Sequence, residues 1–183
     1  MSNLYDPRRL PLAAFARSGG QLPGSAPLAD FPRLYAQSVD AAQEAELSFS
    51  ATGSERFDAT GHPQVWLHVS GHCQLTLECQ RCLRPARLEL GFGRDFRFVA
   101  NEALAAVEDE ESDEDVLVFA RQFDLLELVE DELLMAMPLV PMHDTCPVAP
   151  RFSVADANFD ATAAQPANPF AVLADLKRRP EAD

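Results

Sequence analysis

The stretch at residues 65–98, VWLHVSGHCQLTLECQRCLRPARLELGFGRDFRF, decides the fold, because two long runs of alternating apolar and polar residues flank a short turn. Apolar side chains at every second position indicate a β-strand with one buried face. Proline favours a turn near Pro85, since it fixes its own φ angle and donates no hydrogen bond to a sheet. The stretch therefore predicts a long antiparallel hairpin with CQRCLRP, at residues 79–85, as its tip. The residues of the buried parity are Val65, Leu67, Val69, Cys73, Leu75, Leu77 and Cys79 in the first run, and Leu88, Leu90, Phe92, Phe96 and Phe98 in the second.

A further strand is predicted upstream of the hairpin. Leu47, Phe49 and Ala51 alternate with polar residues, which is typical of a strand with one buried face. Consecutive strands of this kind favour an antiparallel meander that faces the core on one side only.

One main helix is predicted downstream, in the segment FDLLELVEDELLMAMPLVP at residues 123–141. Asp124 is placed to cap the helix, Glu127 completes a capping-box pattern, and Pro138 ends it. We therefore expect an α+β fold, in which an antiparallel sheet is packed by a helix around residues 125–137. The apolar stripe of this helix consists of Leu126, Val129, Leu133 and Met137.

The first part of the chain predicts short helices and turns rather than long elements. Residues 1–45 are interrupted by prolines and glycines, which break both helices and strands. We expect these pieces to dock on a core domain that spans residues 46–150. One amphipathic turn is indicated by Leu28, Phe31, Leu34 and Tyr35.

Three further segments complete the organisation. The run EDEESDED at residues 108–115 carries seven acidic side chains in eight positions, which favours a solvated loop over a cation site. Residues 151–167 are rich in Ala and Asp without periodicity and predict a flexible linker. Residues 168–183 predict a short C-terminal helix and tail, because Asn168 and Pro169 are typical of a helix start.

The hairpin tip holds a candidate metal site. Cys79 and Cys82 form a C-x-x-C pair, whose two thiolates suit one zinc ion on a tight turn. The segment PMHDTCP offers His143 and Cys146 as a second pair of ligands. Zinc takes four tetrahedral ligands, so this set predicts one structural zinc that ties the tip to the chain after the helix.

Other interpretations of the cysteines stay open. Cys79 and Cys82 also fit small apolar core residues, or a redox dithiol, although such a pair normally begins a helix. A reducing cytosol disfavours a disulfide. Cys73 lies six residues before Cys79 on a strand, roughly 20 Å away at ~3.3 Å per residue, which favours a place in the core.

Five arginines crowd the hairpin, one third of the chain's 15 basic residues within seventeen positions. Such a concentration in an acidic chain is a candidate contact for an RNA backbone or a partner protein. Ion pairs with the chain's own acidic loop are an equally good interpretation. The candidates are Arg81, Arg84, Arg87, Arg94 and Arg97.

Composition limits the class of protein. The chain has 183 residues, 47% of them hydrophobic, enough for one domain with a core. No run approaches the roughly 18 apolar residues of a membrane helix, and the N-terminus lacks signal-peptide features. We therefore expect a cytoplasmic protein without membrane contact. A net charge of −14 argues against coating DNA or RNA through overall electrostatics, so any RNA contact has to be local.

No catalytic motif stands out. Zinc deaminases pair C-x-x-C with an H-x-E motif, which none of the four histidines begins. A P-loop, a dinucleotide fingerprint and a nucleophile elbow are also absent. We therefore expect no catalytic residue and no organic cofactor.

Three stretches together resemble the bacterial YceD-like family, known as large ribosomal RNA subunit accumulation proteins. They are LECQRCLRP, FDLLELVEDELLMAMPLVPMHDTC and NPFAVLADLKRR, and in order and spacing they extend over residues 77–179. The resemblance implies a cytoplasmic, non-enzymatic factor needed for synthesis, processing or stability of 23S ribosomal RNA. Its expected partner is precursor 23S rRNA or a large-subunit ribosomal protein, contacted through the arginine-rich hairpin. The alternative is an acidic adaptor or escort for a basic ribosomal protein, without direct RNA contact.

Overall fold

The computed structural model describes residues 5–39, 45–58, 60–110, 112, 114–149, 154 and 170. The chain divides into two compact units, Met1–Ala149 and Pro150–Asp183. The predicted linker at 151–167 and the predicted C-terminal helix at 168–183 lie outside the described residues, apart from the isolated positions 154 and 170. The fold below is that of the first unit.

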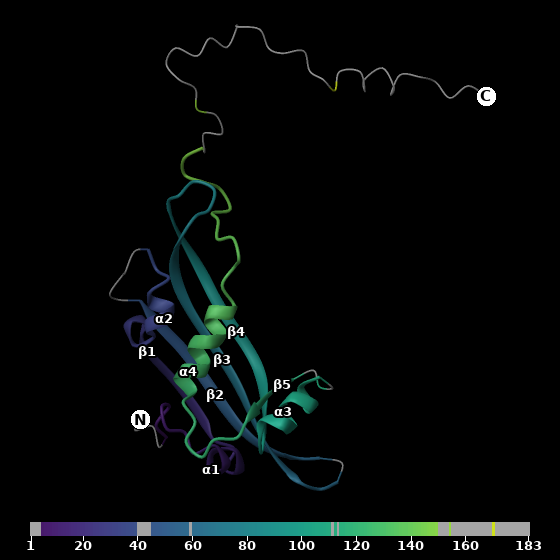
Figure 1. Ribbon diagram of the computed structural model, residues 1–183. Helices are drawn as coiled ribbons and strands as arrows, with labels where there is room; N and C mark the ends of the chain where they lie inside the picture. Colours follow the sequence, from purple (N-terminus) through teal and green to yellow (C-terminus); the bar gives the residue numbers. More distant parts are fainter. Residues whose placement is uncertain are drawn as a thin grey trace, which may run out of the picture. The chain divides into compact units, whose positions relative to one another are not determined.

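A five-stranded sheet forms the centre of this unit (Figure 1). Its strands follow one another in sequence order across the sheet. They are β1 (Gln21–Pro27), β2 (Glu46–Phe57), β3 (Pro63–Glu78), β4 (Pro85–Val99) and β5 (Asp115–Val118).

The predicted antiparallel meander is confirmed for β2 to β4, and β1, which was not predicted, extends it, whereas β5 departs from it. Strands β1 to β4 pair antiparallel, whereas β5 runs parallel to β4. The reason is the helix α3 (Glu102–Asp109), which carries the chain back along the sheet before β5 begins. Parallel neighbours need such a crossover, and a helix usually supplies it. The sheet is therefore mixed.

Helix α3 includes the start of the segment 108–115, which was predicted to be an acidic loop. Asn101 caps the helix by accepting a hydrogen bond from the Leu104 N–H at 3.0 Å. Glu108 and Asp109 form its last turn, and Asp115 already starts β5. Both ends of the acidic run thus belong to regular elements, α3 and β5.

A second correction concerns residues 1–45. Short helices do occur there, namely α1 (Leu12–Arg17), the 3₁₀ turn η1 (Leu28–Asp30) and α2 (Pro32–Tyr35), but residues 21–27 form β1 rather than turns. Prolines within a sheet are confined mainly to edge strands, and β1 is an edge strand. The predicted docking turn is confirmed by the burial of Leu28, Phe31 and Leu34.

The core lies between one face of the sheet and the helices. Helix α4 (Leu125–Met135) packs on β3 and β4, and α1 packs on β2 and β3 (Figure 1). Asp124 caps α4 by accepting hydrogen bonds from the Leu126 and Glu127 N–H groups, both at 3.0 Å. The predicted stripe residues Leu126, Val129 and Leu133 are buried. Within the described residues, no helix has both the length and the apolar character needed to cross a membrane.

Candidate metal centre and the arginine cluster

The hairpin tip is a closed turn held by its own backbone. Residues 79–84 connect β3 to β4, and the Cys79 N–H donates to the Arg84 carbonyl at 2.9 Å. The Leu83 N–H donates to the Cys79 carbonyl at 2.8 Å. Leu83 adopts a left-handed φ of 56°, a conformation that favours glycine. The turn thus fixes the positions of Cys79 and Cys82.

The segment after α4 lies against this turn. The Gln80 N–H donates to the Pro141 carbonyl at 2.9 Å, and His143 Nε2 lies 3.0 Å from the Pro85 carbonyl oxygen. Arg81 donates to the His143 carbonyl at 2.7 Å and, through Nε, to Cys146 Sγ at 3.0 Å. These contacts bring the H-x-x-C segment to the C-x-x-C turn, although more than sixty residues separate them.

The four predicted ligands come together as the sequence pattern indicates. The ligand atoms of Cys79, Cys82, His143 and Cys146 all lie within 4.8 Å of one another. Cys79 Sγ is 3.9 Å from Cys146 Sγ, and Cys82 Sγ is 3.5 Å from His143 Nδ1. A tetrahedral site with metal–sulfur bonds of about 2.3 Å and metal–nitrogen bonds of about 2.0 Å has edges of about 3.8 Å and about 3.5 Å for these pairs. The donor set therefore fits one tetrahedral metal ion.

The protonation of His143 fits the same role. A carbonyl oxygen only accepts hydrogen bonds, so Nε2 carries the proton that faces the Pro85 carbonyl. The lone pair on Nδ1 then faces Cys82. A metal-binding histidine commonly donates its other N–H to a carbonyl, which fixes the tautomer and the ring orientation.

The thiols of the cluster differ in acidity. Burial acts to raise the pKa of Cys79, but hydrogen bonds from backbone N–H groups, that of His143 foremost, lower it to about 5. Burial raises the pKa of Cys82. The tip therefore stabilises a thiolate at Cys79, the form in which cysteine binds metal.

Cys73 is a core residue, as predicted. It is 1% exposed and lies opposite Leu47 on β2 and Leu90 on β4. Burial raises the pKa of its thiol to about 11, so the side chain stays uncharged.

The structure does not bring the five predicted arginines into one surface. Arg97 is 7% exposed and pairs with Glu108 and with Glu114, the latter at 3.1 Å. Arg94 pairs with Asp115 at 3.0 Å and lies 3.2 Å from Glu132. These two arginines neutralise carboxylates of the chain itself, three of them in the acidic run at 108–115, as in the interpretation of ion pairs with the chain's own acidic segment.

The remaining three arginines lie at the hairpin tip. Arg81 is engaged with Cys146 and the His143 carbonyl. Arg84 and Arg87 are exposed, and neither forms an ion pair with any residue in the described part of the chain. Only these two present an uncommitted positive charge at the tip.

Glu132, beside Arg94, is expected to make the stability of the fold depend on pH. One carboxylate oxygen is buried and has no hydrogen-bond partner among the described residues. Burial raises the pKa of Glu132 above its usual value, despite the opposing effect of Arg94. The folded state therefore binds the proton more tightly than the unfolded state, so the stability contributed by this group is full below about pH 4.5 and falls as pH rises.

We expect the variant Glu132→Gln, which stays neutral, to unfold at higher urea than the wild type at pH 8, with a difference that narrows toward pH 5. Urea denaturation of both proteins at several pH values measures this difference. A gap that is constant with pH, or that widens as pH falls, would show that folding does not raise the pKa of Glu132.

Comparison with known proteins places the chain in a family. The family described as "Large ribosomal RNA subunit accumulation protein YceD" matches residues 67–177, which include all four cluster residues. A protein of Haemophilus influenzae with that same name is 37% identical over 129 residues, covering 64% of this chain and 69% of the relative. No solved structure matches the chain. The chain therefore belongs to the YceD family of large ribosomal RNA subunit accumulation proteins.

Proposed function

We propose that the chain is a non-catalytic cytoplasmic factor for the accumulation of 23S ribosomal RNA, and that it acts by binding a basic large-subunit ribosomal protein. The family name supports the link to large-subunit rRNA. The proposal that the partner is a protein depends on the electrostatics of the described surface.

The choice of a protein partner over RNA rests on the ion pairs that Arg94 and Arg97 form with carboxylates. Both arginines pair with the chain's own carboxylates, which offsets their charge, and Arg97 is also buried. RNA binding relies on lysine and arginine to displace counterions. The chain has a net charge of −14, and two of its five candidate arginines are neutralised in this way. It is therefore better suited to bind a lysine- and arginine-rich protein than to bind RNA.

The hairpin tip also exposes aliphatic side chains. Leu83 is 67% exposed and Leu139 is fully exposed, with Val140 and Met142 half exposed nearby in sequence. Proteins that read unpaired RNA stack its bases mainly on aromatic side chains, and residues 79–85 contain none. Exposed apolar groups of this kind favour a protein contact.

The metal cluster supports a structural role. Four protein ligands complete a tetrahedral site, whereas a catalytic zinc keeps one position for water or substrate. Three thiolates and one imidazole are a typical zinc donor set. We infer one structural zinc bound by Cys79, Cys82, His143 and Cys146, which fastens the hairpin tip to the segment after α4.

Direct contact of the tip with rRNA is the second candidate. Arg84 and Arg87 favour it, because they are exposed and free of ion pairs within the described residues. Two such contacts give a weak interaction with a modest salt dependence, because the slope scales with the number of phosphates neutralised.

Binding measurements separate the two candidates. We expect purified basic large-subunit ribosomal proteins to bind the full chain, and the double variant Arg84→Glu/Arg87→Glu to bind them at least as tightly, because it adds negative charge. Fluorescence anisotropy between about 50 and 200 mM salt gives the affinities for these proteins and for 23S rRNA fragments. Tight binding of rRNA fragments that the double variant abolishes, with no ribosomal protein bound, would establish the second candidate instead.

A further inference from the structure

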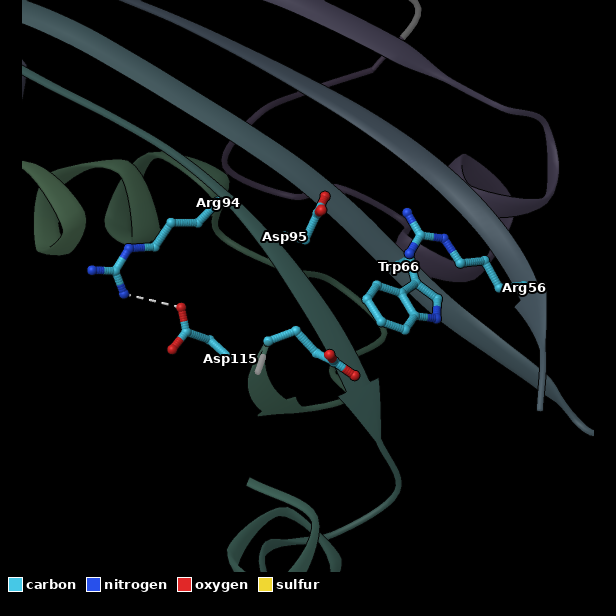
Figure 2. A pocket seen from close by; sticks show the side chains of 6 residues that line it. Arg56, Trp66, Arg94, Asp95 and Asp115 are labelled. Carbon is cyan, nitrogen blue, oxygen red and sulfur yellow. Dashed lines mark hydrogen bonds and ion pairs between the residues drawn. The ribbon is translucent and has the colours of Figure 1, made fainter. Parts of the chain in front are cut away.

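A hollow of about 440 Å³ lies on the sheet. The lining consists of Arg56, Trp66, Arg94, Asp95, Glu114 and Asp115 (Figure 2). Asp115 points toward Arg94 and away from Trp66, so the carboxylates on the side of the indole are those of Asp95 and Glu114. An aromatic face next to carboxylates is a favourable environment for a cation.

Strand parity places Trp66 at this surface. Leu67 and Val69 are buried in the core, so Trp66 and His68 face the other side of the sheet. Trp66 lies opposite Ser54 on β2 and Arg97 on β4. The indole is half-buried, which leaves part of its face accessible. A tryptophan on the outward parity of a strand is a signal that the sequence itself displays.

A guanidinium already occupies the indole face. The Cζ atom of Arg56 lies 4.1 Å from the centroid of the Trp66 ring. Arg56 is exposed, and it forms no ion pair with a residue in the described ranges. An exposed cation–π contact is weak, so a second guanidinium can exchange with that of Arg56. This stacked pair shows that the hollow accepts a guanidinium group on the indole face.

The carboxylates of Asp95 and Glu114, on the side of Trp66, have capacity for further donors. Asp95 accepts from His68 at 3.0 Å and Glu114 from Arg97 at 3.1 Å. A carboxylate offers about four acceptor sites, so one nitrogen partner leaves the others open. Asp95 is 47% exposed at its side chain.

We propose that this hollow receives an arginine side chain from a basic segment of the partner protein, which displaces Arg56 from the face of Trp66. The inference rests on the proposed function, since it assigns the docking point for the basic partner. Arginine suits the hollow better than lysine, because its planar guanidinium both stacks on an indole and donates two parallel hydrogen bonds to a carboxylate.

The test uses the only tryptophan of the chain. The probes are two synthetic peptides of equal charge, one alternating glycine with arginine and the other glycine with lysine. We expect the arginine peptide to change the fluorescence of Trp66 in the full chain on titration, and to bind about threefold more tightly than the lysine peptide. Asp95→Asn is expected to weaken the arginine peptide about threefold.

The variant Arg56→Ala provides the decisive comparison. It removes the internal competitor, so the arginine peptide is expected to bind about two- to fivefold more tightly. The matched control is Arg9→Ala, which removes the same charge from an exposed arginine that does not line the hollow. The control is expected to change the affinity by less than about 1.5-fold.

The outcomes distinguish this inference from the proposed function. Equal tightening by Arg56→Ala and Arg9→Ala, or binding without a change in Trp66 fluorescence, would overturn the inference, and the proposed function would stand if ribosomal proteins bind. A fluorescence change caused by an RNA oligonucleotide and not by the arginine peptide would overturn it in favour of base stacking. Failure of both peptides and of all basic ribosomal proteins to bind would overturn both.

Discussion

Replacement of Glu130 by alanine is expected to lower the free energy of unfolding by about 2–4 kcal/mol, because it leaves two backbone N–H groups without an acceptor and an unpaired buried donor costs about 1–3 kcal/mol. Glu130 is 5% exposed and lies on α4. Its carboxylate accepts hydrogen bonds from the Arg33 N–H at 2.7 Å and the Leu34 N–H at 3.1 Å, and it pairs with the Arg33 guanidinium at 2.9 Å. Its loss leaves the start of α2 without acceptors and separates α2 from α4.

Asp131→Ala is the matched control for this prediction. Asp131 follows Glu130 directly and also pairs with Arg33, at 2.6 Å, but its side chain is 46% exposed. Exposed ion pairs contribute about 0–1 kcal/mol, so the control is expected to stay within about 1 kcal/mol of the wild type. Urea denaturation measures both variants, and equal losses would show that the backbone hydrogen bonds to Glu130 add nothing to the fold.

Removal of the metal is expected to cause the second large loss of stability. Cys82→Ser and His143→Ala each delete one of four ligands, so native mass spectrometry should show one zinc in the wild type and none in either variant. At a free zinc concentration about a hundred times the Kd, binding stabilises the folded state by about 2.7 kcal/mol. In a domain of this size that corresponds to a Tm higher by about 5–10 °C.

The control for the metal prediction is Cys73→Ala. Cys73 is a buried core cysteine outside the cluster, so this variant should lose some stability and keep its zinc. Hydrogen exchange should rise at residues 79–85 and 141–146 in the zinc-free variants, because the two segments are then held together only by a few hydrogen bonds. A wild-type mass without metal and with four free thiols would contradict the zinc site.

The hairpin and its tip were predictable because their signals are local. Alternation of apolar residues set the buried face of β3 and β4, and Pro85 marked the turn. The spacing of Cys79 and Cys82 then predicted half of a metal site. The pairing with His143 and Cys146 rested only on ligand count, and the structure brings these residues together through contacts of the tip with residues 141–146.

Other features depend on long-range contacts that the sequence does not display. The parallel pairing of β5 requires the crossover α3, whose last residues belong to the same acidic run that also starts β5. The loss of Arg97 from the surface depends on Glu108 and Glu114, which approach it only after the chain has turned back. Strand β1 contains two prolines, and its edge position, which makes them tolerable, is a property of the whole sheet.

The most direct test of the proposed function is the ratio of 23S to 16S rRNA in a strain that lacks its own copy of the protein and carries variants of this chain. The variants are Arg84→Glu/Arg87→Glu at the tip and an acidic-face variant, Asp95→Lys/Glu110→Lys, which reverses the charge of the exposed Asp95 in the hollow and of the exposed Glu110 at the end of α3, compared at equal protein levels. We predict that the tip variant restores the wild-type ratio and that the acidic-face variant leaves it as low as in the deletion strain. Loss of 23S rRNA with the tip variant and full restoration with the acidic-face variant would contradict a factor that acts through a basic protein partner.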